Sequence, residues 1–235
     1  MIPKKIHYCW FGGGPKGKKE LKCIESWKKF CPDYEIIEWN ETNVDLDMMP
    51  FVREAYNAKK YAFVSDVVRL WILINNGGLY FDTDVEIIKS FDNLLKYNGF
   101  IGFENNNFLN TGQGVGAQKN NPIIKEMFDY YKNLKFLNPD GSYNMYGCPK
   151  VNTEIFVNHG LQTNGKFQII DDFAVFPMDY FNPYDDPTGK LNLTENTHSI
   201  HWYSKSWMNK SSIIRSKISK PLHRLQKLVR GNYGK

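Results

Sequence analysis

The sequence predicts an α/β fold in which helices cover a sheet that contains parallel strands. Three stretches near its start carry this prediction. Residues 5–11 form a β-prone run that ends in a Gly-Gly-Gly-Pro turn signal, apolar residues recur at helical spacing over 21–30, and 34–39 form a second strand-like run. A strand, a helix and a strand in this order are typical of a βαβ unit with two parallel strands.

The most apolar stretch of the chain, 61–76, predicts a buried helix, because apolar side chains occupy most of its circumference. Asn75-Asn76-Gly77-Gly78 marks its end, since glycine readily adopts the left-handed cap conformation. Beyond it we expect a strand over 79–81, a helix over 122–134, loops after Phe136 and a strand over 198–203, with a polar stretch rich in Asn and Gly over 105–121.

Composition indicates a folded protein in a reducing compartment. The chain has 235 residues, and its 42% hydrophobic content can fill a sizeable core. No apolar run approaches the ~20 residues of a membrane-spanning helix, and the first residues do not resemble a secretory signal. The four cysteines, Cys9, Cys23, Cys31 and Cys148, form no CxxC pair, so we expect free thiols and a cytoplasmic protein.

The net charge of +5 belongs to the C-terminal end of the chain. Residues 208–235 contain eight Lys/Arg and no acidic residue, which leaves −3 for residues 1–207. A mildly acidic body argues against a nucleic-acid groove. We expect one domain over 1–207 and a basic, amphipathic, helical tail over 208–235 that lies on an anionic membrane. The alternatives for the tail are packing on the domain and disorder.

Two D-x-D sequences occur, and their contexts differ. Asp82-Thr83-Asp84 directly follows the predicted apolar strand, whereas Asp45-Leu46-Asp47 lies in a polar stretch. The ends of parallel strands are where open sheets bind ligands, and two carboxylates there suit Mn²⁺ or Mg²⁺. We therefore predict metal ligands at Asp82 and Asp84; the alternative is a solvated turn.

Other polar or aromatic residues fall where chemistry is expected. Asp66 and Arg69 share one face of the apolar helix, so they either hold a sugar and a phosphate or form a buried ion pair with each other. Trp10 either stacks on a base or is buried. The segment 201–207 brings together His201, Lys205 and three aromatic residues, so His201 could complete a metal site and Lys205 could contact a diphosphate. The alternative is an aromatic cluster that seals the domain.

Taken together, these residues resemble glycosyltransferase family 32, the sugar transferases with a D-x-D motif. The resemblance is carried by IPKKIHYCWFGG (2–13), SWKKFCPDYEIIEWN (26–40) and KYAFVSDVVRLWILINNGGLYFDTDVEII (60–88). It implies a GT-A type fold, a Rossmann-like mixed sheet flanked by helices. The large glucosylating toxins share a similar core.

The resemblance also implies roles for individual residues. Trp10 would stack on the nucleotide base, Asp66 and Arg69 would hold the donor sugar, and Asp82 and Asp84 would bind Mn²⁺ or Mg²⁺, with Asp82 also contacting the donor. His201 would complete the metal site, although a glycine of the related C-terminal element is missing here. Either Asn110 or Gln113 would place an amide near the anomeric carbon.

From these roles we expect a metal-dependent hexosyltransferase that retains anomeric configuration by same-face substitution. Its donor would be a nucleotide-sugar, with UDP-galactose, UDP-glucose or UDP-N-acetylglucosamine favoured. Its acceptor would be a saccharide, lipid-linked, in bacterial capsule or lipopolysaccharide synthesis at the cytosolic face of the inner membrane. The alternatives are a metal-dependent nucleotidyltransferase or phosphohydrolase, and a non-enzymatic binding module on the membrane.

Overall fold

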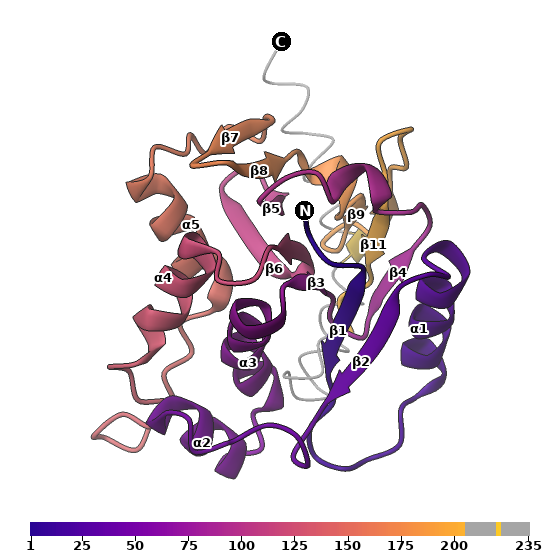
Figure 1. The fold of residues 1–235 in the computed structure, drawn as a ribbon. Coiled ribbons are helices and arrows are strands. Elements are labelled where there is room, and N and C mark those ends of the chain that lie inside the picture. The colour runs from indigo at the N-terminus through magenta and orange to yellow at the C-terminus, as the bar shows by residue number, and fades with distance from the viewer. Residues whose placement is uncertain (205–219, 222–235) are drawn as a thin grey trace.

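The computed structural model describes residues 1–204 and 220–221, and its centre is a seven-stranded mixed sheet with helices on both faces (Figure 1). In chain order the elements are β1 (Lys5–Cys9), α1 (Lys18–Phe30), β2 (Glu35–Trp39), α2 (Pro50–Asn57), α3 (Tyr61–Asn76), β3 (Gly78–Tyr80), β4 (Val85–Ile87), η1 (Asp92–Leu94), β5 (Gly99–Asn105), β6 (Phe108–Ala117), α4 (Pro122–Tyr131), α5 (Cys148–Asn158), β7 (Gln168–Ile170), β8 (Phe173–Phe176), η2 (Met178–Tyr180), β9 (Tyr184–Asp185), β10 (Lys190–Leu191) and β11 (Ser199–His201).

Strand order in the main sheet is β2-β1-β3-β6-β5-β8-β7. β1 is parallel to both β2 and β3, and β5 is parallel to β8. β6 is antiparallel to its two neighbours, and β7 is antiparallel to β8. The expected βαβ opening is therefore present, and the sheet is mixed, as the resemblance implied. β4 and β11 pair in a separate two-stranded sheet, as do β9 and β10.

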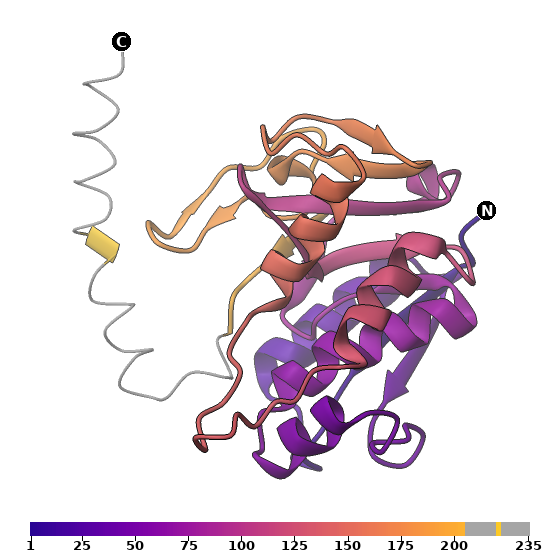
Figure 2. The ribbon, with the colours of Figure 1, turned by 90° about the vertical axis from the view of Figure 1, so that its left-hand side faces the viewer.

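Helices on opposite faces of the sheet bury two apolar clusters. Helices α2, α3, α4 and α5 lie on one face of the sheet and α1 lies on the other (Figures 1 and 2). The buried side chains of each group form one of the two clusters. On α1, Trp27 is fully buried and its indole donates to the backbone oxygen of Val85, 2.7 Å away. This contact attaches α1 to the chain just after Asp82-Thr83-Asp84. Leu21 of α1, grouped with the buried stripe at the sequence level, is half exposed.

The helix predicted over 61–76 is α3, with the expected bounds. Most of its apolar side chains are buried, and it ends at Gly77, where φ is +65°. A Cβ at Gly77 would lie 2.8 Å from the backbone nitrogen of Lys119, so this position needs both the conformation and the size of glycine. The chain can therefore turn sharply from α3 into β3.

The second half of the chain is more regular than predicted. The expectation of loops between Phe136 and the strand near 198–203 is wrong in part, because α5 and strands β7 to β10 lie there. The helix expected over 122–134 ends at Tyr131. The Asn- and Gly-rich stretch forms the end of β5 and the whole of β6, a buried central strand. Its glycines make room for aromatic rings, since a Cβ at Gly116 would lie 2.3 Å from the ring of Phe100.

Two remaining expectations concern thiols and membranes. All four cysteines are buried and free. No helix within residues 1–204 and 220–221 has the length and hydropathy of a membrane span. The predicted tail lies outside the described residues except at Lys220 and Pro221. The Lys220 ammonium donates to Tyr184 Oη at 2.8 Å and lies 3.4 Å from Asp186 Oδ1, which is packing of one tail residue on the domain.

Candidate active site

The D-x-D sequence at 82–84 forms the turn between β3 and β4, at the carboxyl end of a central strand. The Asp82 amide donates to Gly112 O of β6 at 2.9 Å. On the other side, β11 pairs with β4 so that His201 lies opposite Val85. Strand β3 ends at Tyr80, so the turn after it and the β4–β11 pairing bring the side chains of Asp82, Asp84 and His201 together. Elements far apart in sequence thus meet at this turn.

Asp82, Asp84 and His201 offer ligand atoms that all lie within 4.8 Å of one another. His201 Nε2 is 3.3 Å from Asp84 Oδ1, and buried His201 Nδ1 has no hydrogen-bond partner within the described part of the chain. Two carboxylates and an imidazole are a donor set that Mn²⁺ accepts. The residues present therefore fit the divalent ion that the sequence predicts.

The pairing of Asp84 with His201 determines their pKa values. Burial by itself would raise the pKa of Asp84, but the charge and hydrogen bond of His201 and the amide of Ser204, 2.6 Å away, outweigh it and lower the pKa to about 2. Burial would lower the pKa of His201, and Asp84 reverses that effect and raises it. Asp84 is therefore held as a carboxylate.

Arg69 joins the predicted sugar-binding helix to the D-x-D turn. Its Nη2 lies 2.9 Å from Asp66 Oδ1 and 3.1 Å from Asp82 Oδ1, and its side chain is 3% exposed. Tyr80 Oη donates to the same Asp82 oxygen at 3.1 Å. The buried ion pair weighed at the sequence level is therefore present, but it includes Asp82. Burial raises the pKa of Asp66, and Arg69 opposes that shift.

Cys148 and Thr111 form the wall of this buried cluster. Arg69 Nη1 donates to Thr111 Oγ1 at 3.1 Å and contacts Cys148 Sγ at 3.8 Å. Cys148 is the first residue of α5, and Asn152 one turn later donates to Thr111 Oγ1 at 3.4 Å. Sequence reasoning missed this wall because α5 was not predicted.

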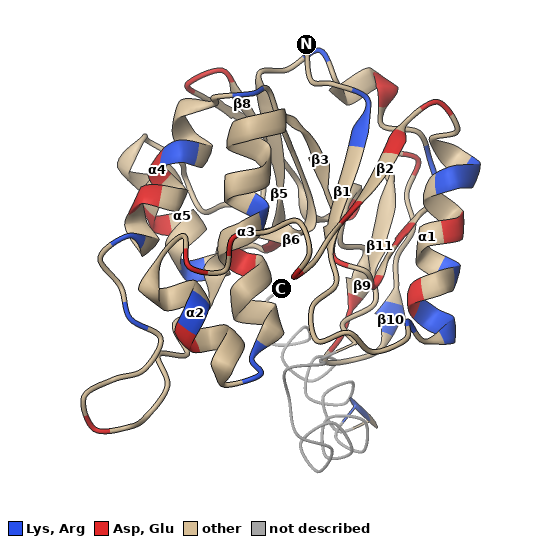
Figure 3. Ribbon diagram, turned by 60° about the horizontal axis from the view of Figure 1, so that its bottom comes forward, with Lys and Arg blue, Asp and Glu red and all other residues tan. Residues whose placement is uncertain are grey.

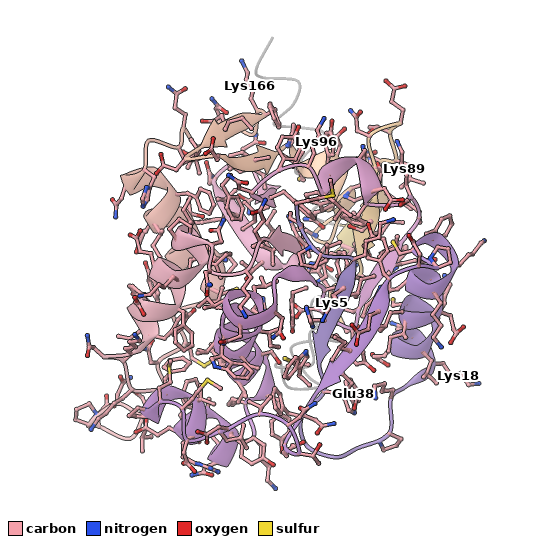
Figure 4. The ribbon with its side chains drawn as sticks, in the orientation of Figure 1. Lys5, Lys18, Glu38, Lys89, Lys96 and Lys166 are labelled. Carbon is pink, nitrogen blue, oxygen red and sulfur yellow. The ribbon has the colours of Figure 1, made fainter. Side chains whose placement is uncertain are left out.

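Trp10 directly follows β1 and is partly exposed. Its indole donates to Gly14 O at 2.6 Å, and the Lys16 ammonium lies 5.4 Å from the ring centre. Glu38, labelled in Figure 4 at the end of β2, accepts hydrogen bonds from Lys16 and Tyr8, both at 2.6 Å. The loop between β1 and α1 is thus held beside Trp10 through Gly14 and Lys16.

The two candidate amides lie in different surroundings on β6. Gln113 is fully buried and donates to Gly102 O and Phe103 O at 2.9 and 3.1 Å, so it holds the neighbouring strand β5. The Asn110 side chain accepts from the Gly112 amide at 2.7 Å and donates to Glu104 at 3.1 Å. A Cβ at Gly112 would lie 2.1 Å from Asp82 Oδ2, so Asn110 stands close to the D-x-D carboxylates.

Glu104 is a further carboxylate at this site that the sequence did not single out. Its Oε1 accepts from Asn110 and, at 3.2 Å, from Tyr203 Oη. The Tyr203 ring in turn packs against the His201 ring, with ring centres 4.1 Å apart and the ring planes tilted by 33°. A chain of contacts therefore links Asp82 through Gly112, Asn110, Glu104 and Tyr203 to His201. The sequence signal that could have pointed to Glu104 is an acidic residue near the end of an apolar strand.

The predicted diphosphate contact, Lys205, lies outside the described residues.

Comparison with known proteins agrees with this geometry. Residues 17–101 match the family model described as "Glycosyltransferase sugar-binding region containing DXD motif". The D-x-D turn and Arg69 thus lie within a region of the DXD glycosyltransferase type. The resemblance to glycosyltransferase family 32 predicted from the sequence is confirmed by this match.

Curated relatives match part of the chain. Inositol phosphoceramide mannosyltransferase 3 of Schizosaccharomyces pombe is 32% identical over 111 residues, 43% of this chain. Subversion of eukaryotic traffic protein A of Legionella pneumophila is 26% identical over 162 residues, 55% of this chain. The matches span 29% and 25% of those proteins' own lengths.

A solved structure supports the fold. The glycosyltransferase PaToxG superposes with a TM-score of 0.51 at 24% identity, over 67% of this chain and 69% of its own. This likeness is one of fold, and it agrees with the predicted GT-A type fold, a mixed sheet flanked by helices.

Proposed function

We propose that this protein transfers a sugar from a nucleotide-sugar to a hydroxyl of a saccharide acceptor, with a divalent cation at Asp82, Asp84 and His201. The observation that carries the proposal is the Arg69 ion pair with Asp82, which places a buried sugar-binding candidate directly beside the metal ligands. A nucleotidyltransferase or phosphohydrolase would use the metal ligands but would leave Asp66, on the same helix face as Arg69, without a ligand to hold.

The bound cation would neutralise the negative charge that builds on the departing nucleoside diphosphate. Trp10 would stack on the base, and Asp66 would accept hydrogen bonds from hydroxyls of the donor sugar. Arg69 holds Asp66 and Asp82 in fixed positions, because one buried guanidinium contacts both. We assign the amide near the anomeric carbon to Asn110, since the Gln113 amide is occupied with strand β5.

We retain same-face substitution as the mechanism. In that step the anomeric carbon–oxygen bond to the diphosphate breaks, the acceptor oxygen bonds to the same carbon, and the acceptor proton moves to the departing phosphate oxygen. The alternative is a carboxylate that attacks the anomeric carbon. Glu104 is the residue to examine for that role, because it directly contacts Asn110. A glycosyl adduct on Glu104, found by mass spectrometry of the protein with donor alone, would contradict the mechanism.

We keep a UDP-sugar as the favoured donor, and GDP-mannose joins the candidates because a relative is a mannosyltransferase by name. A lipid-linked acceptor and a position at the cytosolic membrane face, with the tail on an anionic surface, remain part of the proposal. Their support is the basic composition of residues 208–235.

The first experiment is thermal unfolding with Mn²⁺ and a panel of UDP- and GDP-sugars. A donor at 100 times its dissociation constant adds about 2.7 kcal/mol to the free energy of unfolding. We expect a metal-dependent shift with one donor, and its loss in Asp82→Ala/Asp84→Ala. The matched control is Asp45→Ala/Asp47→Ala, the other D-x-D, which is exposed at both aspartates. Absence of a shift with every donor would favour the phosphoryl-transfer alternative.

A further inference from the structure

A shallow groove of about 370 Å³ runs between α5 and the start of β6, outside the site described above. Its lining consists of Phe108, Tyr146, Lys150, Thr153, Glu154, Val157 and Asn158. We propose that this groove is the acceptor subsite and that it binds one sugar unit of a saccharide. The proposal rests on the proposed function and adds the place and chemical class of the acceptor.

The groove and the active site share two chain elements, β6 and α5. On β6, Phe108 in the groove is two residues from Asn110, and the Leu109 amide between them donates to Thr153 Oγ1 at 2.9 Å. On α5, Lys150 in the groove is two residues from Cys148, which contacts Arg69. Both β6 and α5 therefore lead within two residues from the groove to residues of the candidate active site, Asn110 and Cys148.

The lining has the mixed chemistry that a sugar ring requires. Phe108 and Tyr146 supply aromatic rings for the apolar face of a pyranose, while Lys150, Glu154 and Asn158 supply donors and acceptors for hydroxyls. The Tyr146 ring is held in place: its hydroxyl donates to Glu154, and the Lys150 ammonium lies 5.1 Å from its centre. An acyl chain would leave these charged groups without a ligand.

The size of the groove also favours a single sugar unit over a protein. Pockets for small ligands start at about 300 Å³, and 370 Å³ is at the low end of that range. A stable protein–protein contact needs about 800 Å² on each partner, which a groove of this size does not supply by itself.

Ligand-observed saturation-transfer NMR tests the proposal on the full chain. The probes are methyl α-mannoside, methyl α-galactoside and octyl β-glucoside below its micelle concentration, each with Mg²⁺ and UDP or GDP to occupy the donor site. We expect transfer to the sugar-ring protons of at least one probe, and a loss of affinity of about fivefold in Lys150→Ala and in Phe108→Ala, which matches loss of about 1 kcal/mol of contact energy.

Lys28→Ala is the matched control, because Lys28 is an exposed lysine on α1, across the sheet from α5 (Figure 3). No saturation transfer to any probe, equal affinity in the variants, or displacement of the probe by nucleotide would overturn the proposal. Transfer to the octyl chain alone would show an apolar occupant and would also overturn it. Failure of the proposed function is seen separately, as the absence of metal-dependent nucleotide binding in the same samples.

Discussion

The guanidinium of Arg69 on α3 forms a 3.1 Å ion pair with Asp82 in the turn after β3, and the same nitrogen lies 2.9 Å from Asp66. This arrangement makes helix α3 and the D-x-D turn one electrostatic unit. A charge removed from the helix therefore affects the turn as well.

Arg69→Ala should lower the free energy of unfolding by about 3–5 kcal/mol, because it leaves two carboxylates without their buried partner. Chemical denaturation followed by circular dichroism measures this loss. Arg53→Ala is the matched control, since Arg53 pairs with Asp47 on the surface. A similar effect in both variants would contradict the buried role of Arg69.

Gly112→Ala should abolish metal-dependent nucleotide binding while the protein still folds. The added Cβ would lie 2.1 Å from Asp82 Oδ2, so the carboxylate must move. Calorimetric titration with Mn²⁺ and nucleotide measures the binding. Gly14→Ala is the control, because no atom lies within 4 Å of a Cβ at that position. Unchanged binding in Gly112→Ala would show that Asp82 is not a ligand.

Asn110→Ala should reduce kcat by at least about tenfold, since loss of one group that stabilises a transition state costs 10²–10³ in known cases. Gln113→Ala should act on stability, by about 1–3 kcal/mol, because two buried carbonyls of β5 lose their donor. Steady-state kinetics and denaturation of both variants separate the two roles. A loss of kcat in Gln113→Ala and a loss of stability in Asn110→Ala would reverse the two assignments.

His159 should make stability depend on pH. Hydrogen bonds with Glu126 at 2.7 Å and Asp171 at 2.5 Å raise its pKa above 6.5. Its contribution is complete below the unfolded-state pKa and is lost as the pH rises through the folded-state pKa. The unfolding temperature of the wild type should therefore exceed that of His159→Gln most at pH 5–6 and least near pH 9. The effect is modest, because the His159 side chain is 29% exposed.

A constant difference across this pH range would show that the histidine does not titrate with folding. Glu126→Gln should reduce the pH dependence without removing it, since the contact with Asp171 remains.

Thiol reactivity provides an independent test of the native packing. Burial raises the pKa to about 12 for Cys9 and Cys23 and to about 11 for Cys31. The folded protein should therefore react slowly with a thiol reagent at pH 8. In the unfolded chain, all four cysteine thiols should react. Rapid labelling of the native protein would contradict the described packing.

The sequence by itself determined the first half of the fold and the type of site. Apolar spacing and the Asn-Asn-Gly-Gly cap predicted α3 at its observed bounds, because a long, buried helix leaves a periodic signal. Asp66, Arg69 and the D-x-D pair were found because charges directly within or after apolar elements are costly without a role.

Only the tertiary structure decided which residues share the site. Helix α5 and strand β6 escaped prediction because their glycines, prolines and amides are typical of loops, and their burial depends on aromatic rings from distant strands. For the same reason Cys148 had no signal as a site residue, and the signals at Glu104 and Tyr203 did not place either residue at the site. The contacts of Cys148 with Thr111 and of Tyr203 with Glu104 span 37 and 99 positions of the chain, which no short sequence window contains.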